Sequence, residues 1–361
     1  MSINNIRKYE SRFDYEVSGN DPLVTTNPPQ VGDSWVNTTT GEIFVCIDAT
    51  IDDNVWKGTQ GNTIRGWIFE GGEYMLVIGG EPSNGVPHDL IQQFMFSSEL
   101  NTTNINTLSV ATYPAWTGKS QTRGYIGSIG GREGPYATNV VEYVLLATPE
   151  TAVQAATTLT DGQSWSGQLN TESHIYVGCG ISNGGTGNTS DSQRIIKYSV
   201  QGDTAETDLG DLLTGYTTTE WLASGASWED TGLWLGGDDA IHTHQFSNDN
   251  VQFIGNTLTQ YHELGNYSAR SDTHAYVWGS YNHNNCSKVA KANQVVSANI
   301  FTGGYGYGGV GQTANSGYNP GGAANWSVTN NIWRVNFSND TSATDIADLT
   351  VAAGNMSVIS H

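Results

Sequence analysis

The sequence predicts an all-β fold in which six similar four-stranded units form a β-propeller. A short apolar strand that ends at glycine recurs six times along the chain. The spacing of these copies, roughly 45 to 55 residues, is typical of propeller blades. Glycine occurs 44 times in 361 residues and only 14% of residues are charged, which favours short strands joined by turns over long helices. Because a four-stranded unit cannot bury both faces alone, we expect the six units to pack radially.

The recurring strand is clearest at residues 74–80, where the sequence YMLVIGG places an apolar run before a glycine pair. Glycine is expected at such a strand end where a side chain would collide with the neighbouring backbone. The other copies, the last of them degenerate, are at 125–131, 175–180, 233–237, 275–279 and 318–322.

Three further strands complete each predicted unit. The second strands are expected at 90–96, 140–144, 195–200, 241–246, 288–292 and 332–337. The third element ends in leucine followed by Ser or Thr in all units but the fifth, at Leu108, Leu159, Leu213, Leu258 and Leu349. A fourth strand, rich in Gly, Ser and Trp, leads into the next copy. Residues 355–361 stand where the other units have this fourth strand, so we expect them to pair beside residues 74–80 and close the ring.

The chain before the repeats divides into three predicted parts. Residues 1–22 are polar with scattered aromatics and are expected to be an N-terminal arm. Residues 23–61 form a small β-hairpin module, with paired strands at 35–36 and 43–46 around a turn at 40–41 and a third strand at 55–56. Residues 62–73 are expected to be a linker, and residues 74–361 to be the propeller.

A motif in this module carries a resemblance. The pattern Gly-Asp-x-Trp-x-Asn-x-x-Thr-Gly-Glu-x-Phe-x-Cys at residues 32–46, followed by Trp56, resembles a hairpin module common in bacteriophage tail-fibre and other virion proteins. The resemblance implies a virion location and a homo-oligomer. It also implies docking onto other virion proteins through the N-terminal region, with Trp35, Phe44 and Trp56 as candidate docking residues.

Two other interpretations of the module stay open. In outline it is also similar to the small chitin-binding domains of secreted hydrolases, in which exposed tryptophans stack on sugar rings. Alternatively, Trp35 and Trp56 form the core of a block that has little else to bury. The repeats resemble kelch-like propellers in their glycine pair and aromatic strands, without the full signature of that family.

Composition and charge exclude several classes of partner. The formal net charge is −21 and the chain has only 14 Lys and Arg residues, which argues against binding to nucleic acid or to anionic membrane surfaces. No window approaches the roughly 18 consecutive apolar residues of a membrane span, so no membrane insertion is expected. The cysteines Cys46, Cys179 and Cys286 lie far apart and are expected to be free, buried thiols.

The sequence offers little catalytic chemistry. His242 and His244 alternate on one strand and therefore project from the same face, with Asp238 and Asp239 just upstream. This is the best metal candidate, but a solvated strand face is the favoured interpretation. We expect no metal and no cofactor. We also find no paired acid and base and no activated nucleophile, so no enzyme is predicted.

A glycine-rich stretch at residues 303–322 interrupts the repeats. Glycine allows such a loop to expose Tyr305, Tyr307 and Tyr318, with Trp326 nearby, as rigid aromatics for a glycan or protein partner. An irregular structural loop is the alternative. The sequence thus predicts a virion appendage, a tail or head fibre for host-surface recognition or assembly. The alternatives are a glycan-binding lectin outside a virion and a polysaccharide-degrading propeller enzyme.

Overall fold

The computed structural model is all-β, as predicted, and contains no helix among the residues it describes. Two compact units, Met1–Ile68 and Phe69–His361, are described separately below. The described residues are 15–51, 54–59, 63–64, 71–82, 86–112, 116–127, 139–151, 153–159, 163–164, 166–178, 181–182, 194–200, 204–211, 213, 223–236, 240–255, 258, 267–280, 283–302, 309–324, 327–340 and 343–361.

The N-terminal unit holds a five-stranded sheet in the order β1-β2-β3-β4-β5. Its strands are β1 (Tyr15–Ser18), β2 (Ser34–Asn37), β3 (Ile43–Asp48), β4 (Val55–Gly58) and β5 (Thr63–Ile64). The three predicted strands of the module are confirmed as β2, β3 and β4. The sheet also includes β1, which falls in the predicted arm, and β5, which falls in the predicted linker. Both are short edge strands that take their order from pairing with a neighbour, and neither carries an apolar pattern of its own.

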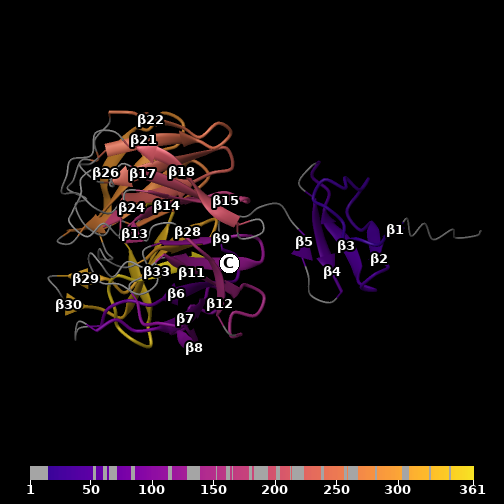
Figure 1. The fold of residues 1–361 in the computed structure, drawn as a ribbon, viewed down its shortest axis with the longest axis horizontal. Coiled ribbons are helices and arrows are strands. Elements are labelled where there is room, and N and C mark those ends of the chain that lie inside the picture. Colours follow the sequence, from indigo (N-terminus) through magenta and orange to yellow (C-terminus); the bar gives the residue numbers. More distant parts are fainter. Residues whose placement is uncertain are drawn as a thin grey trace, which may run out of the picture. The chain divides into compact units, whose positions relative to one another are not determined.

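The C-terminal unit contains six four-stranded antiparallel sheets among the described residues, an arrangement consistent with a β-propeller (Figure 1). We number them sheets 1 to 6 along the chain and give their strands in spatial order. Sheet 1 is β33 (Ser357–Ser360), β6 (Tyr74–Ile78), β7 (Leu90–Met95) and β8 (Thr103–Thr107). Sheet 2 is β9 (Trp116–Lys119), β10 (Arg123–Gly127), β11 (Val140–Leu145) and β12 (Gln154–Thr158). Sheet 3 is β14 (Gly167–Asn170), β15 (His174–Gly178), β17 (Arg194–Ser199) and β18 (Thr204–Asp211).

Sheets 4 to 6 repeat this order. Sheet 4 is β19 (Ala223–Ser227), β20 (Thr231–Gly236), β21 (Ala240–Gln245) and β22 (Asn250–Phe253). Sheet 5 is β23 (Tyr267–Arg270), β24 (His274–Ser280), β25 (His283–Ala290) and β26 (Val296–Thr302). Sheet 6 is β27 (Gly311–Gln312), β28 (Ser316–Pro320), β31 (Asn331–Asn336) and β32 (Thr344–Asp348). Two short pairs lie outside these sheets, β13 (Gln163–Ser164) with β16 (Ile181–Ser182) and β29 (Ala323–Ala324) with β30 (Ser327–Val328).

The recurring strands of the sequence form the second strand of every sheet. These strands are buried on both faces; in β6 all five side chains are at most 4% exposed. Met75 and Val77 pack in one cluster with residues of sheet 6, whereas Leu76 and Ile78 pack with residues of sheet 2. Each sheet is therefore held between two others. The five leucines that mark the third elements are all at most 3% exposed, at Leu108, Leu159, Leu213, Leu258 and Leu349.

The C-terminal strand completes the first sheet, as predicted. β33 pairs antiparallel with β6, from Ser357 opposite Ile78 to Ser360 opposite Met75. The glycine pair after β6 borders the same C-terminal segment. Gly80 has a φ of +114°, and a Cβ there would lie 2.8 Å from the carbonyl oxygen of Gly354. The expected reason for glycine at this strand end, a close backbone approach, is therefore confirmed for Gly80.

The first strands of the sheets contact one another in sequence, and we call them the inner strands: β33, β9, β14, β19, β23 and β27. β9 contacts β14, and the contacts continue through β19, β23 and β27 to β33, which in turn contacts β9. The approach between sheets 3 and 4 is close: a Cβ on Gly225 would lie 2.0 Å from the carbonyl oxygen of Gln168.

Candidate functional site

The two histidines singled out in the sequence lie inside the protein. His242 and His244 sit on β21 and are both 0% exposed, so the expected solvated strand face is wrong. The apolar surroundings explain this: the His242 ring lies 5.2 Å from the ring of Phe253, and the His244 ring lies 4.7 Å from that of Tyr176. Asp238 and Asp239 lie outside the described residues. Among the residues that are described, no group of three or more His, Cys, Asp or Glu side chains is placed to hold a metal ion.

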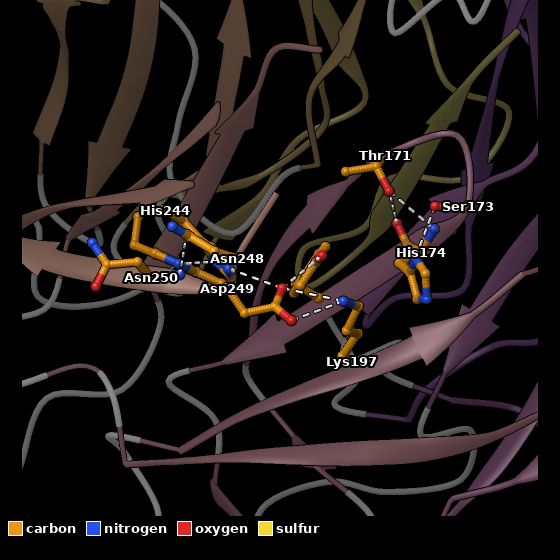
Figure 2. A network of polar contacts seen from close by, with 10 residues as sticks. Thr171, Ser173, His174, Lys197, His244, Asn248, Asp249 and Asn250 are labelled. Carbon is orange, nitrogen blue, oxygen red and sulfur yellow. Dashed lines mark hydrogen bonds and ion pairs between the residues drawn. The ribbon is translucent and has the colours of Figure 1, made fainter. Parts of the chain in front are cut away.

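His244 belongs to a polar network between sheets 3 and 4 (Figure 2). Its Nε2 lies 3.7 Å from a carboxylate oxygen of Asp249, whereas the ammonium of Lys197 lies 2.8 Å from the other oxygen. The hydroxyl of Tyr176 donates to the same carboxylate at 3.0 Å. Burial lowers the pKa of His244 to about 4, so its imidazole is neutral at pH 7. Because Lys197 already neutralises Asp249, this carboxylate is a poor ligand for a metal cation.

The same arrangement occurs three times among the described residues, and we call it the tyrosine clamp. A tyrosine from the second strand of one sheet and a cation from its third strand hold an acidic residue of the next sheet. The three clamps are Tyr176 and Lys197 on Asp249, Tyr276 and Lys288 on Asp340, and Tyr318 and Arg334 on Glu99. Each acidic residue has a positive φ, of 53, 48 and 48° respectively. Repetition at equivalent places indicates a role in joining sheets rather than a unique catalytic site.

The third clamp joins the last sheet to the first. The guanidinium of Arg334 in sheet 6 donates to both oxygens of Glu99 at 2.6 and 2.7 Å, and the hydroxyl of Tyr318 donates to one of them at 3.2 Å. Tyr74 and Tyr125 lie on β6 and β10, the second strands of sheets 1 and 2. Their hydroxyls donate to backbone carbonyls of the next sheet, those of Leu146 and Val200.

The placement of Tyr318 corrects the predicted binding surface. Tyr318 is only 4% exposed, and its ring packs 4.8 Å from that of Phe96 and 5.7 Å from that of Phe94. The prediction that it is an exposed aromatic is wrong, because it lies in β28, a second strand, and not in a loop. Burial and the neighbouring Glu99 raise its pKa to about 12. The other three members of that surface, Tyr305, Tyr307 and Trp326, lie outside the described residues.

The candidate docking residues of the N-terminal module are largely internal. Phe44 and Trp56 are 0% and 2% exposed and form a small core with Cys46, so neither side chain can contact a partner surface. Trp35 is half-buried, and its ring meets that of Trp56 edge-on at 6.3 Å. This unit exposes apolar residues at Ile43, Val45 and Ile47 on the other face of β3, which are 42%, 36% and 53% exposed, and also at Val17, Leu23, Val31 and Ile51.

The ends of the inner strands surround a cavity of about 120 Å³. All six inner strands contribute, and most of the side chains are polar. The lining residues are Thr117, Gly118, Lys119, Gln168, Asn170, Gly225, Ala226, Ser227, Ser268, Ala269, Arg270, Val310, Gln312, Val358, Ile359 and Ser360. Two of them, Lys119 and Arg270, are charged, and both are cations.

Hydrogen bonds across this cavity link each inner strand to the next. The side-chain oxygen Oδ1 of Asn170 accepts from the backbone N–H of Lys119 at 2.6 Å. The backbone N–H of Asn170 donates to the hydroxyl oxygen of Ser227 at 2.7 Å. The remaining links are Ser268 to the carbonyl of Gly225 at 2.7 Å, the N–H of Arg270 to Gln312 at 2.7 Å, the N–H of Gln312 to Ser360 at 2.8 Å, and Thr117 to the carbonyl of Val358 at 2.8 Å.

Sequence reasoning missed this cavity because each unit contributes only two or three of its residues. A signal exists nonetheless. Lys119, Asn170, Arg270 and Gln312 each stand six positions before the second-strand tyrosine of their unit. Aligning the units on that tyrosine brings four polar residues into one column, at the point where each inner strand ends.

Comparison with known proteins gives no family for this chain. No protein-family model matches it, and no curated protein sequence matches it significantly. No helix among the described residues is long and apolar enough to span a bilayer.

Proposed function

We propose that the chain is a structural component of a bacteriophage virion, a tail- or head-fibre-like appendage. Its N-terminal region attaches to other virion proteins, and its six-bladed, kelch-like β-propeller is displayed for host-surface recognition or assembly. The observation that carries this proposal is the virion-module pattern at residues 32–46, which coincides with β2 and β3 of a separate compact unit. The protein has no catalytic role in this proposal, and its active form in the particle is a homo-oligomer.

The contacts between sheets support a closed propeller. The inner strands contact one another from β33 through to β27 and back to β33, and each neighbouring pair shares a hydrogen bond across the cavity. The clamp of Tyr318 and Arg334 on Glu99 joins sheet 6 to sheet 1 in the same way as the other clamps join their sheets. These contacts favour a closed ring of six blades.

Attachment is assigned to the exposed face of β3 in place of the buried core of the module. Ile43, Val45 and Ile47 alternate with buried residues and therefore share one face of the sheet. Exchanging Val45 and Ile47 together for serine should reduce incorporation into particles at least tenfold without unfolding the unit, because both side chains are already exposed. Val110→Ser, at a residue 53% exposed in the C-terminal unit, is the matched control. Normal incorporation of the double variant contradicts this attachment face.

The virion assignment is tested on the particles themselves. Purified particles are labelled with gold-conjugated antibody against residues 69–361 and imaged by electron microscopy. Labelling of an external appendage is the expected result. Antigen found only in the soluble fraction of lysed cells, at any stage of infection, refutes the proposal.

Host recognition is assigned to the aromatic residues Tyr305 and Tyr307. The double variant Tyr305→Ala and Tyr307→Ala should weaken adsorption roughly tenfold, about 1.4 kcal/mol, with little change in melting temperature. Adsorption equal to that of the wild type would remove this assignment while leaving the virion location intact.

A glycan-binding lectin is the second candidate, and the polar central cavity is the observation that favours it. Amides and hydroxyls such as those of Gln168, Ser227 and Gln312 are the groups that recognise sugars. The cavity gives no support to glycoside hydrolysis. That chemistry uses a pair of carboxylates, and the described residues lining the cavity include none.

A further inference from the structure

One of the three tyrosine clamps has a buried histidine beside it. In each clamp, the residue five positions before the acidic residue packs with the clamp tyrosine. This residue is at most 1% exposed in all three clamps, and it is His244 in sheet 4, Val335 in sheet 6 and Phe94 in sheet 1. Of these side chains, only the imidazole takes up a proton in mildly acidic solution. We propose that the contact between sheets 3 and 4 is an acid-sensitive switch, which opens when His244 is protonated while the other two clamped contacts stay closed. The proposed switch does not depend on the location of the protein.

The hydrogen bonds of His244 oppose a second proton on its ring. Nδ1 accepts from the Nε1–H of Trp234 at 3.4 Å, so the neutral imidazole carries its proton on Nε2. That nitrogen faces the carboxylate of Asp249 at 3.7 Å (Figure 2). Protonation places an N–H group on Nδ1, directly opposite the N–H group of Trp234. Both residues are 0% exposed, so two donors then face each other away from water, and the bond between the two rings is lost.

The charges around His244 do not favour an imidazolium either. Among the described residues, Asp249 is the acidic group that faces it, and this carboxylate already receives the ammonium of Lys197 at 2.8 Å and the hydroxyl of Tyr176 at 3.0 Å. His174 also borders Lys197 and Asp249. The strands beside β21, β20 and β22, contain no titratable residue. An imidazolium would therefore share one carboxylate with a second cation inside the protein, which is unfavourable. In agreement, burial lowers the pKa of His244 to about 4 against the opposing effect of Asp249.

The contact between sheets 5 and 6 is a natural reference, because it has the same clamp of tyrosine, lysine and aspartate without the buried histidine. In both contacts a histidine two positions before the tyrosine, His174 or His274, has its Nδ1 2.8 Å from a neighbouring hydroxyl. The two contacts differ beside the tyrosine, where one has His244 and the other Val335. His242 lies on the same strand and the same face as His244, so it provides a matched control position.

The direction of the response follows from proton uptake. In the open form His244 meets water and regains its ordinary pKa of 6.5, whereas in the closed form its pKa is about 4. Opening therefore binds a proton at any pH between these values, and the open fraction rises as the pH falls below 6.5. With these two pKa values, the ratio of open to closed molecules should increase about twentyfold between pH 7 and pH 5.

Two buried thiols can report on the two contacts within one molecule. Ala240→Cys places a thiol in the apolar cluster between sheets 3 and 4, at a residue 4% exposed. The native Cys286 is 0% exposed and lies in the cluster between sheets 5 and 6. Ile195→Cys, at a residue 0% exposed on the sheet 3 side of the first cluster, is the second probe in case Ala240→Cys impairs folding.

The test is thiol labelling of the folded full chain at pH 7 and pH 5 with dithiodipyridine, a disulfide that reacts with thiols in acid. Mass spectrometry quantifies each labelled cysteine. Each rate is divided by the rate of the same thiol in the urea-unfolded chain at the same pH, which removes the intrinsic effect of pH on the thiol. The relative rate of the introduced thiol should rise about twentyfold from pH 7 to pH 5. That of Cys286 should change less than twofold.

Three further substitutions in the labelled chain identify the residue responsible. His244→Gln offers an acceptor to Trp234 and is not protonated in this range, so the increase should shrink to less than threefold. His244→Phe introduces the residue that packs beside the clamp tyrosine in sheet 1 and should have the same effect. His242→Gln should keep the increase. The proposal is overturned by no increase in chains with His244, by an increase that persists in both His244 variants, by an equal increase at Cys286, or by an increase that His242→Gln removes as fully as His244→Gln.

Discussion

Removal of residues 357–361 deletes β33 and is the most direct test of the proposed closure of the propeller. Val358 and Ile359 are 8% and 3% exposed, and each such side chain contributes about 1.5 to 3 kcal/mol when buried. The carbonyl of Val358 accepts from Thr117 and that of Ser360 from Lys119, at about 1 kcal/mol per bond. The expected loss is therefore about 5 to 8 kcal/mol, against a total stability of about 5 to 15 kcal/mol for a typical domain.

Urea denaturation followed by tryptophan fluorescence measures this loss as a shift of the unfolding midpoint. A synthetic peptide of residues 354–361 added to the truncated chain should restore part of the stability in a concentration-dependent way, because binding to the folded state stabilises it. Leu100→Ala, at a side chain 69% exposed, is the control and should change stability by less than about 0.5 kcal/mol. A truncated chain with the same unfolding midpoint as the full chain would refute the closure. If the truncated chain is destabilised but the peptide does not raise its midpoint, the closure is refuted as well.

Three further outcomes follow from the packing and the clamps. Gly225→Ala places a Cβ 2.0 Å from the carbonyl oxygen of Gln168, and it should cost about 2 kcal/mol or more in urea denaturation, whereas Gly72→Ala has open space and should be silent. His244 has an ordinary pKa of 6.5 that folding lowers to about 4; the unfolded chain therefore binds more protons in this range. The free energy of unfolding should fall by about 3 kcal/mol as the pH drops from 6.5 to 4. A free energy of unfolding that does not change over this pH range contradicts the prediction. Tyr318→Phe removes a bond to a carboxylate and should cost about 1.5 to 3 kcal/mol by thermal unfolding, more than the roughly 1 kcal/mol of Tyr125→Phe, whose acceptor is a carbonyl.

The order of the strands could be predicted from the sequence because each strand is marked by residues that are adjacent in the chain. A buried strand needs an unbroken apolar run, and the glycine at its end is required by a backbone approach such as that of Gly80 to Gly354. The partner of β6 was also predictable, because residues 355–361 were the one segment left without a unit of its own. These inferences need only the residues of one strand, or the assignment of each segment of the chain to a repeat unit.

The sites were less accessible because they depend on which face of a strand is covered. β3 has apolar residues at every position from Ile43 to Ile47, so alternation does not reveal that Phe44 faces the core and that its two apolar neighbours face solvent. Tyr318 stands in a glycine-rich segment typical of loops, yet its strand lies between two others in sheet 6. The cavity combines Lys119 with Arg270, and only the packing of the inner strands in the folded protein brings residues so distant in sequence together.

The pairing of β33 with β6 also dictates an order of events during synthesis. The strand at residues 74–78 leaves the ribosome long before its inner partner, which begins at residue 357, is made. Until then β6 presents an unpaired edge, the feature of a sheet most prone to associate with other chains. Contacts between segments so far apart in sequence also slow folding. Chains that end before residue 357 should thus aggregate far more readily than chains that contain β33.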